Sequence, residues 1–313
     1  MTRGRLFSKM RILTSGLLLL LSLCILLCSC DPVDAIDDFM NSIFPSNEGE
    51  DLPPPELPTG SMRVHFIDVG QADCILLETP DGCVLVDAGD LDRDVTEHVA
   101  DYLRALSIEK IDYFVLTHPH ADHIGGAPTI LEEFQVGRVL MTDAATTTAI
   151  FNRTLDAIDK NDVPVTRAEV GESYTLGALR MTALAPASVE DADLNNTSIV
   201  LRVDYGGSSL MLTGDAETES LDDVLESFPA SYLDCDAMKA GHHGAENANS
   251  ESFLEAVSPE LVVISCGKDN SYGHPHEEAL ERFDTVGADV YRTDVLGTVV
   301  LISEDDSFRV EQP

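Results

Sequence analysis

The chain has 313 residues and a strongly acidic composition, with 56 acidic residues against 19 basic ones and a net charge of −37. A surface of that sign repels polyanions at long range, so the composition argues against extensive non-specific binding of nucleic acid. The same charge fits a saline environment or a requirement for solubility.

Residues 1–29 are predicted to form an export signal. Four basic residues and no acidic ones precede an apolar run over residues 16–27, which is shorter than the ~20 residues of a membrane span. The run ends in Leu27-Cys28-Ser29-Cys30, which resembles the lipobox of bacterial lipoproteins. That resemblance implies cleavage before Cys30 and a lipid on Cys30, which would then be the membrane anchor. A plain signal anchor is the alternative.

Residues 30–61 are predicted to be a tether. Asp, Asn, Pro, Glu and Ser dominate the segment, and Pro53-Pro54-Pro55 favours an extended form. Without the four basic residues of the signal segment, the net charge of the remaining chain becomes −41. Residues 62–313 have the length of one large domain.

The periodicity of this domain predicts strands and helices in two similar halves. In the first half we expect strands at residues 62–69, 73–78, 83–87, 111–116 and 138–141, and helices at 94–106, 127–134 and 146–160. In the second half we expect strands at 179–184, 197–203, 209–212, 235–238, 261–265, 290–292, 298–302 and 308–310, with helices at 217–228, 251–257 and 277–286. Two sheets packed face to face, with helices outside, is the arrangement that this order suggests.

Four of the seven cysteines lie in the domain, each in or beside an apolar, β-rich run: Cys74, Cys83, Cys235 and Cys266. No pair has the spacing of a zinc ribbon. Buried free thiols are the expected state, and a disulfide is the alternative outside the cytoplasm.

A histidine cluster follows the predicted strand at residues 111–116. His118 and His120 are two residues apart, and Asp122 and His123 follow directly. In a loop between a strand and a helix, these four side chains can converge on one small volume. Imidazole suits zinc, iron or nickel, and the carboxylate extends the choice to manganese.

Residues 118–123 resemble the His-x-His-x-Asp-His motif of the metallo-β-lactamase superfamily. Val86-Asp87-Ala88-Gly89 resembles the first motif, whose aspartate supports the metal loop. Leu212-Thr213-Gly214-Asp215 resembles the motif whose aspartate bridges two metals. The resemblance implies an α+β fold, a four-layer αββα sandwich, and two divalent cations, zinc or manganese.

Further motifs resemble the ComEC-type branch, the hydrolase domain of DNA-uptake competence proteins. They occur in that branch's order, as FIDVGQAD at residues 66–73, NTSIVL at 196–201, GHHG at 241–244 and YGHP at 272–275. Ala72 stands where the branch usually has glycine. Since the membrane-spanning part of a competence channel is absent, a free-standing, lipid-anchored relative is expected.

One departure from the wider superfamily concerns the third motif. No histidine lies between His123 and Asp215, so the third-motif histidine is missing and Asn195 or Asn196 is expected in its place. An amide oxygen is a weaker ligand than imidazole, so one metal is expected to exchange more easily, and β-lactam hydrolysis is disfavoured.

The resemblance implies a role for each residue of the site. His118 and His120 hold the first metal, Asp122 and His123 the second, Asp215 bridges them, and His274 completes one shell. A hydroxide formed between the metals attacks the substrate and is oriented by Asp122. His243 acts as the general acid, with His242 as the alternative.

The outcome for four other residues is open at this point. Lys239 either meets a phosphate or is a surface lysine at a strand end. His276 is expected to cap a helix. Gln71 and Asp73 either orient the site or shape a turn.

The function that this pattern predicts is metal-dependent hydrolysis of phosphodiesters, in the manner of a nuclease. A hydrolase of small esters, thioesters or lactones is the alternative, and a lipid-anchored binding protein with a decayed site is the alternative from another class. The expected location is the bacterial cell envelope, outside the cytoplasm, with the membrane as partner through Cys30.

Overall fold

The computed structural model describes residues 60–190, 192–304 and 306–311. The predicted signal segment, Cys30 and nearly all of the tether lie outside these residues. Among the helices of the described residues, none has the length and apolar character required to cross a membrane.

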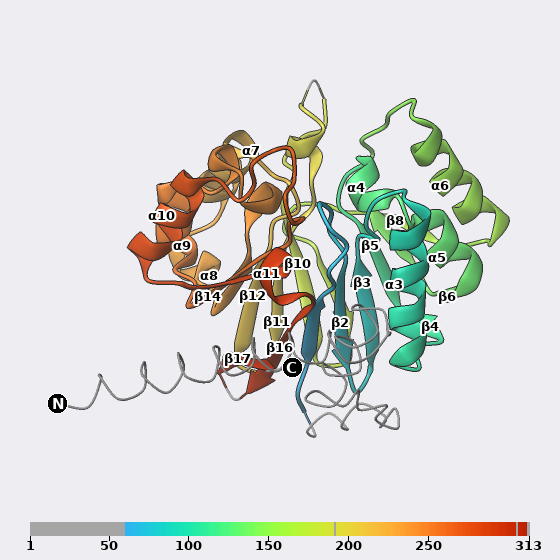
Figure 1. Ribbon diagram of the computed structural model, residues 1–313, viewed down its shortest axis with the longest axis horizontal. Helices are drawn as coiled ribbons and strands as arrows, with labels where there is room; N and C mark the ends of the chain where they lie inside the picture. Colours follow the sequence, from blue (N-terminus) through green and yellow to red (C-terminus); the bar gives the residue numbers. More distant parts are fainter. Residues whose placement is uncertain (1–59, 191, 305, 312–313) are drawn as a thin grey trace, which may run out of the picture. The chain divides into compact units, whose positions relative to one another are not determined.

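Two large sheets form the centre of the domain (Figure 1). The first has the strand order β17-β16-β1-β2-β3-β5-β7-β8. Its strands are β1 Arg63–Phe66, β2 Ile75–Thr79, β3 Gly82–Val86, β5 Tyr113–Leu116, β7 Val139–Met141, β8 Val165–Arg167, β16 Val299–Glu304 and β17 Ser307–Glu311. Two short strands, β4 Lys110–Ile111 and β6 Gln135–Val136, pair with each other in a separate two-stranded sheet.

The second sheet has the order β15-β14-β13-β12-β11-β10-β9. Its strands are β9 Ser173–Leu176, β10 Leu179–Ala185, β11 Val200–Tyr205, β12 Ser208–Leu212, β13 Ala237–Lys239, β14 Leu261–Ile264 and β15 Asp289–Arg292. Helices cover the outer face of each sheet (Figure 1). They are α3 Arg93–Ala105, α4 Ala121–Ile124, α5 Ala127–Glu133 and α6 Ala149–Lys160 on the first sheet, and α7 Thr218–Ser227, α8 Ala230–Leu233, α9 Glu251–Val257 and α10 Glu277–Val286 on the second, with α11 Thr293–Leu296 after β15.

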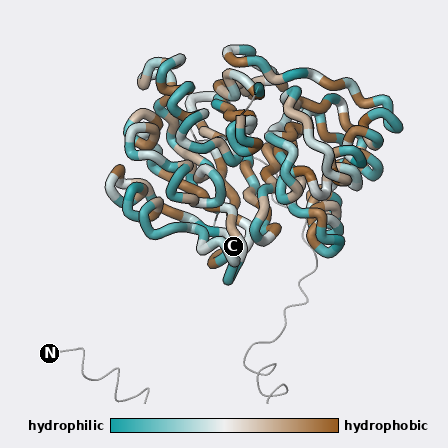
Figure 2. Tube along the Cα trace, turned by 90° about the horizontal axis from the view of Figure 1, so that it is seen from above, coloured by the Kyte–Doolittle hydropathy of each residue, from teal (hydrophilic) through white to brown (hydrophobic). Residues whose placement is uncertain are grey.

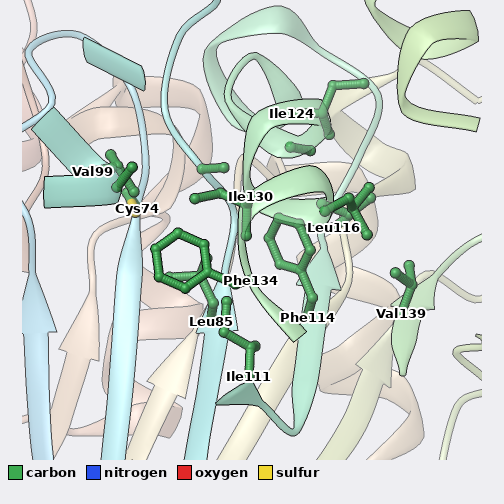
Figure 3. Close-up of a cluster of buried hydrophobic side chains, with 14 of the residues drawn as sticks. Cys74, Leu85, Val99, Ile111, Phe114, Leu116, Ile124, Ile130, Phe134 and Val139 are labelled. Carbon is green, nitrogen blue, oxygen red and sulfur yellow. The ribbon is translucent and has the colours of Figure 1, made fainter. Parts of the chain in front are cut away.

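Three buried clusters hold these layers together. The middle cluster takes side chains from both sheets, such as Phe66 and Leu201. The first outer cluster packs Phe114 and its neighbours against Ile130 and Phe134 of the α5 region (Figure 3), and the second packs the other sheet under α7, α9 and α10. Hydrophobic and hydrophilic stretches alternate along the chain (Figure 2), as expected where each element buries one face.

The predicted four-layer αββα sandwich is confirmed, and the differences are local. The predicted strand at 197–203 is wrong at its start, because Asn195–Thr197 forms a 3-10 helix, η1, and β11 begins at Val200. Strands β8 and β9 were not predicted. Their residues are exposed or half-buried, so they lack the apolar alternation that reveals a buried strand.

The parallel strands place the functional loops at one edge. In the first sheet β3, β5 and β7 are parallel, and in the second sheet β12, β13 and β14 are parallel. Loops after their carboxyl ends therefore meet at the same rim of the sandwich, which is the usual place for a site in such sheets.

All four cysteines of the domain are buried free thiols, as the sequence predicts. Burial raises the pKa of Cys83 and of Cys235 to about 12, and that of Cys266 to about 11. Since the thiolate is the reactive form, these side chains are protected both by position and by protonation.

We therefore expect the domain thiols to react only after unfolding. In a chain with Cys24, Cys28 and Cys30 replaced by Ser, dithionitrobenzoate should detect four thiols in guanidinium and none in the folded protein over the same time. Rapid reaction of the folded chain, or fewer than four thiols after unfolding, would contradict this assignment.

Candidate functional site

The site begins at Asp87, directly after β3. Its backbone has φ 58°, and its buried carboxylate accepts hydrogen bonds from the amide and the hydroxyl of Thr117, at 2.9 and 2.7 Å. The Nδ1 atom of His123 lies 2.7 Å from the same carboxylate. Asp87 therefore orients the loop after β5, which is the supporting role that the sequence predicts.

The hydrogen bond to Asp87 determines which nitrogen of His123 is free. Because Nδ1 donates to the carboxylate, the lone pair of a neutral ring lies on Nε2. That Nε2 atom is buried without a hydrogen-bond partner, and it faces Oδ2 of Asp215 at 3.1 Å. A buried nitrogen with a free lone pair, held from behind by a carboxylate, is the usual arrangement of a histidine metal ligand.

His118 and His120 form a second pair of facing nitrogens. Nε2 of His118 lies 3.0 Å from Nδ1 of His120. The Nδ1 atom of His118 is 3.2 Å from the hydroxyl of Thr117 and 3.2 Å from that of Ser198. Burial holds the pKa of His118 well below its usual value, so the ring is neutral, the form that binds metals.

Asp122, His123, Asp215 and His243 form one of two clusters of possible metal ligands among the described residues. One atom from each lies within 4.8 Å of the others. Nδ1 of His243 donates to the carbonyl of Ser265 at 2.9 Å, so its Nε2 faces the carboxylates of Asp122 and Asp215, each at 3.4 Å. The sequence predicts proton transfer for His243 and metal binding for His274, whereas His243 belongs to this cluster of possible ligands.

The pKa shifts in the cluster reflect attraction between its carboxylates and its imidazole rings. Burial opposes ionisation of Asp122, but the hydrogen bond from His243 and the positive charges of the His123 and His243 rings together lower the pKa of Asp122 to about 2. Burial likewise opposes the charged form of His123, yet the carboxylates of Asp215 and Asp87 raise its pKa well above the usual value. The residues fit cations, because carboxylate oxygens and the Nε2 atoms of two imidazoles converge on one buried volume, where a cation would replace the Nε2 protons.

Lys239 and Asp73 form a buried ion pair beneath this cluster. The Lys239 ammonium lies 2.6 Å from the Asp73 carboxylate and 3.5 Å from that of Asp215, and it donates to the carbonyl of Gly214 at 2.9 Å. Lys239 has no exposed surface. The interpretation of Lys239 as a surface lysine is therefore wrong. The interpretation that it contacts a substrate phosphate is also wrong, because its ammonium is enclosed below the cluster.

An open cleft lies above the cluster, with an empty volume of about 620 Å³ that includes its mouth. The side chains that line it come from both halves of the sandwich: Gln71, His120, Ala121, Asp122, Asn195, Asp215, His242, His243, Tyr272 and His274. Of the two candidate amides, Asn195 lies in the cleft, and its Oδ1 is buried without a hydrogen-bond partner. Asn196 instead accepts from the amide of Glu217 at 3.0 Å.

His274 has a different hydrogen-bond environment from the other histidines. The orientation of the Gln71 side-chain amide is fixed, because its Oε1 atom accepts a hydrogen bond from the backbone amide of Gly267 at 3.0 Å. Nε2 of Gln71 therefore donates to Nδ1 of His274, at 3.2 Å. Burial and the neighbouring His243 lower the pKa of His274 to about 4, so the neutral ring carries its proton on Nε2.

The structure brings most of the predicted site residues into one place. His118, His120, Asp122, His123, Asp215, His243 and His274 all lie in the cleft or directly beneath it. Gln71 and Asp73 orient side chains of the site, which is one of the two roles that the sequence leaves open for them. His276 is the N-cap residue of α10, as predicted, but its side chain makes no cap hydrogen bond.

Comparisons with known proteins agree with this geometry. The sequence profile of the metallo-beta-lactamase superfamily matches residues 67–173. ComE operon protein 3 of Bacillus subtilis is 30% identical over 279 residues, 83% of this chain and 34% of that protein. Competence protein ComA of Neisseria gonorrhoeae is 30% identical over 79% of this chain and 33% of its own length. The chain thus spans about a third of these curated relatives.

Solved structures share the fold at low sequence identity. The metallo-beta-lactamase fold protein YhfI from Bacillus subtilis has a TM-score of 0.54 and 14% identity, over 77% of this chain and 100% of that one. CmlA, a diiron beta-hydroxylase from Streptomyces venezuelae, has a TM-score of 0.50 and 17% identity, over 82% of this chain and 55% of that one. Since one of these folds carries a hydroxylase, the fold alone does not select hydrolysis.

The buried ion pair gives a prediction about stability. Replacing Lys239 by Met leaves the Asp73 carboxylate buried without its counter-charge, so we expect a loss of about 3–5 kcal/mol in the free energy of unfolding, measured by urea denaturation in a metal chelator. The double variant Lys239→Met/Asp73→Asn should recover part of that loss, because it removes both charges.

Arg93→Ala is the matched control, since the pair of Arg93 and Glu97 is exposed and its removal should cause no measurable change. Equal stability of Lys239→Met and this control would show that the buried pair does not hold the sheets together.

Proposed function

The chain belongs to the metallo-beta-lactamase superfamily, and from that premise we propose that it is a metal-dependent hydrolase of phosphodiesters. One observation carries the proposal. Asp122, His123, Asp215 and His243 converge within 4.8 Å, beside the facing nitrogens of His118 and His120, at the base of an open cleft.

The hydrogen bonds of the histidines support a division of these residues between two cations. His118 and His120 would hold the first, and Asp122, His123 and His243 the second, with Asp215 between them. Two divalent cations supply Lewis acidity and lower the pKa of water, so that a nucleophile is available at neutral pH. Either zinc or manganese fits this set of nitrogen and carboxylate donors.

His274 is better placed to act on the substrate than to bind a metal. Its Nδ1 atom already accepts from Gln71, so Nε2–H is a hydrogen-bond donor in the wall of the cleft. Its low pKa keeps the ring neutral at physiological pH. We therefore assign His274 to hold a phosphoryl oxygen, where negative charge builds up during attack.

The preference for phosphodiesters rests on the resemblance to the competence-protein branch and on the donor set. Two cations suit displacement at phosphorus because they contact both the attacking and the leaving oxygen. Small esters, thioesters and lactones are the second candidate, favoured by the acidic composition, which repels long polyanions.

We further propose that the chain is attached to the bacterial envelope through Cys30, outside the cytoplasm. The support is the short apolar run and the lipobox-like Leu27-Cys28-Ser29-Cys30.

The Cys30 proposal predicts a change of compartment. In cells that express the chain, Cys30→Ser should abolish incorporation of labelled fatty acid and release the protein from the membrane fraction. Ser29→Ala is the control, because a small residue before the cysteine is retained. Unchanged labelling of Cys30→Ser would reject the lipid anchor.

The activity prediction uses the purified chain with manganese or zinc. We expect hydrolysis of bis-p-nitrophenyl phosphate, and we expect His118→Ala to lose metal-dependent turnover because it removes one of two facing ligands. His98→Ala is the matched control, since His98 is an exposed histidine on α3 and should leave turnover unchanged.

Two results would overturn the proposal. Near-wild-type turnover by His118→Ala, with its metal content unchanged, would reject the metal assignment. Hydrolysis of a lactone panel without cleavage of phosphodiesters would make the second candidate the function.

A further inference from the structure

The loop between β14 and α10 presents an exposed aromatic ring to the cleft. Tyr272 is 68% exposed and lines the cleft beside His274. The two rings are stacked, with centroids 5.7 Å apart and an interplanar angle of 26°. An exposed aromatic ring in the wall of a binding cleft offers a flat apolar surface to a ligand.

Hydrogen bonds hold the backbone of this loop in place. Oδ1 of Asn270 accepts from the amides of Tyr272 and His274, at 3.2 and 3.0 Å. Nδ1 of His276 accepts from the amide of Glu246 at 3.1 Å, so its Nε2 donates to the carbonyl of Tyr272, at 3.2 Å. The position of the exposed ring is therefore fixed by the loop, although the ring itself is not buried in the core.

The cleft provides no side-chain cation for a row of phosphates. Among the described residues that line it, none is Lys or Arg, and Lys268 lies in the same loop but not in the lining. Proteins that bind long nucleic acid use many such cations. Here the chain as a whole carries the opposite sign, with a net charge of −37.

These observations point to a short substrate that is recognised by its ring. Resting on the proposed function, we infer that Tyr272 stacks on a nucleobase and that the substrate is a short nucleotide phosphodiester. Its phosphate would lie at the base of the cleft near His274, and its base over the free face of Tyr272. Base–aromatic stacking supplies binding energy without a row of phosphate contacts.

Two substrates with the same leaving group test this inference on the full chain with manganese. Thymidine 5′-(p-nitrophenyl phosphate) carries a nucleobase, and methyl p-nitrophenyl phosphate does not. Tyr272→Ala should raise the KM for the thymidine compound roughly 10-fold, the size expected for lost stacking, with kcat nearly unchanged. The kinetic constants for the methyl compound should not change.

Three further variants separate stacking from other effects. Tyr272→Phe keeps the ring and should resemble the wild type, whereas Tyr272→Leu keeps apolar bulk without the ring and should resemble Tyr272→Ala. Val295→Ala is the control for an exposed apolar side chain outside the cleft, since Val295 is also 68% exposed. The dissociation constant of adenosine 5′-monophosphate, measured by equilibrium dialysis, gives the same comparison without turnover.

Each outcome decides one part of the inference. An equal rise in KM for both substrates, or no rise for either, would reject nucleobase stacking while the phosphodiesterase proposal stands. Much stronger competition by a long single-stranded oligonucleotide than by a dinucleotide would reject the short substrate. If the wild type cleaves neither compound, the proposed function itself fails, and unchanged nucleotide binding by Tyr272→Ala would then reject stacking independently.

Discussion

The two sheets are joined at the site by a buried ion pair, and the functional geometry depends on it. Asp73 lies in the loop before β2 of the first sheet, and Lys239 is the last residue of β13 in the second. Removing two charges from water costs several kcal/mol for each ion, so neither side chain is tolerated in the core without the other. The same ammonium donates to the carbonyl of Gly214, next to Asp215. A shift of one sheet against the other would leave a buried charge unpaired, so the pair fixes the relative position of the site's two halves.

Negative charge exceeds positive charge around this pair, and that excess explains how the histidines are oriented. Asp73, Asp87 and Asp215 are buried, with Lys239 as the fully buried ammonium beside them. In His123 and His243 the Nδ1 atom is bound to Asp87 and to a backbone carbonyl, respectively, so each Nε2 turns inward toward the carboxylates. A divalent cation neutralises such a cluster more completely than protons on the rings do, because it contacts several oxygens and nitrogens at once.

The sequence predicts the parts of this arrangement that are local. His118, His120, Asp122 and His123 occupy one loop, so their spacing alone reveals a ligand cluster. The partnership of Asp73 with Lys239 joins residues far apart in the chain, and a lysine at the end of a strand is usually exposed; only the packing of two sheets buries it. The roles of His243 and His274 depend on which nitrogen meets the carbonyl of Ser265 or the amide of Gln71. Spacing holds no information on hydrogen-bond direction, so the spacing of the histidines does not distinguish a metal ligand from a hydrogen-bond donor.

The acidic composition and the proposed binding of a phosphate in the cleft are compatible if the negative charge discriminates between substrates by their length. At physiological ionic strength a surface charge is screened beyond ~8 Å, so the hydrogen-bond donors and bound cations of the proposed site would dominate for a single phosphate inside the cleft. A longer polyanion would place its other phosphates outside the cleft, where the net charge of −37 adds repulsion and no Lys or Arg of the described lining offsets it. Discrimination is a difference of affinities, and repulsion of the wrong ligand contributes as much as attraction of the right one. Under the proposed function, the acidic composition therefore favours short substrates over long polyanions, and ring stacking on Tyr272 is a contact that the charge does not oppose.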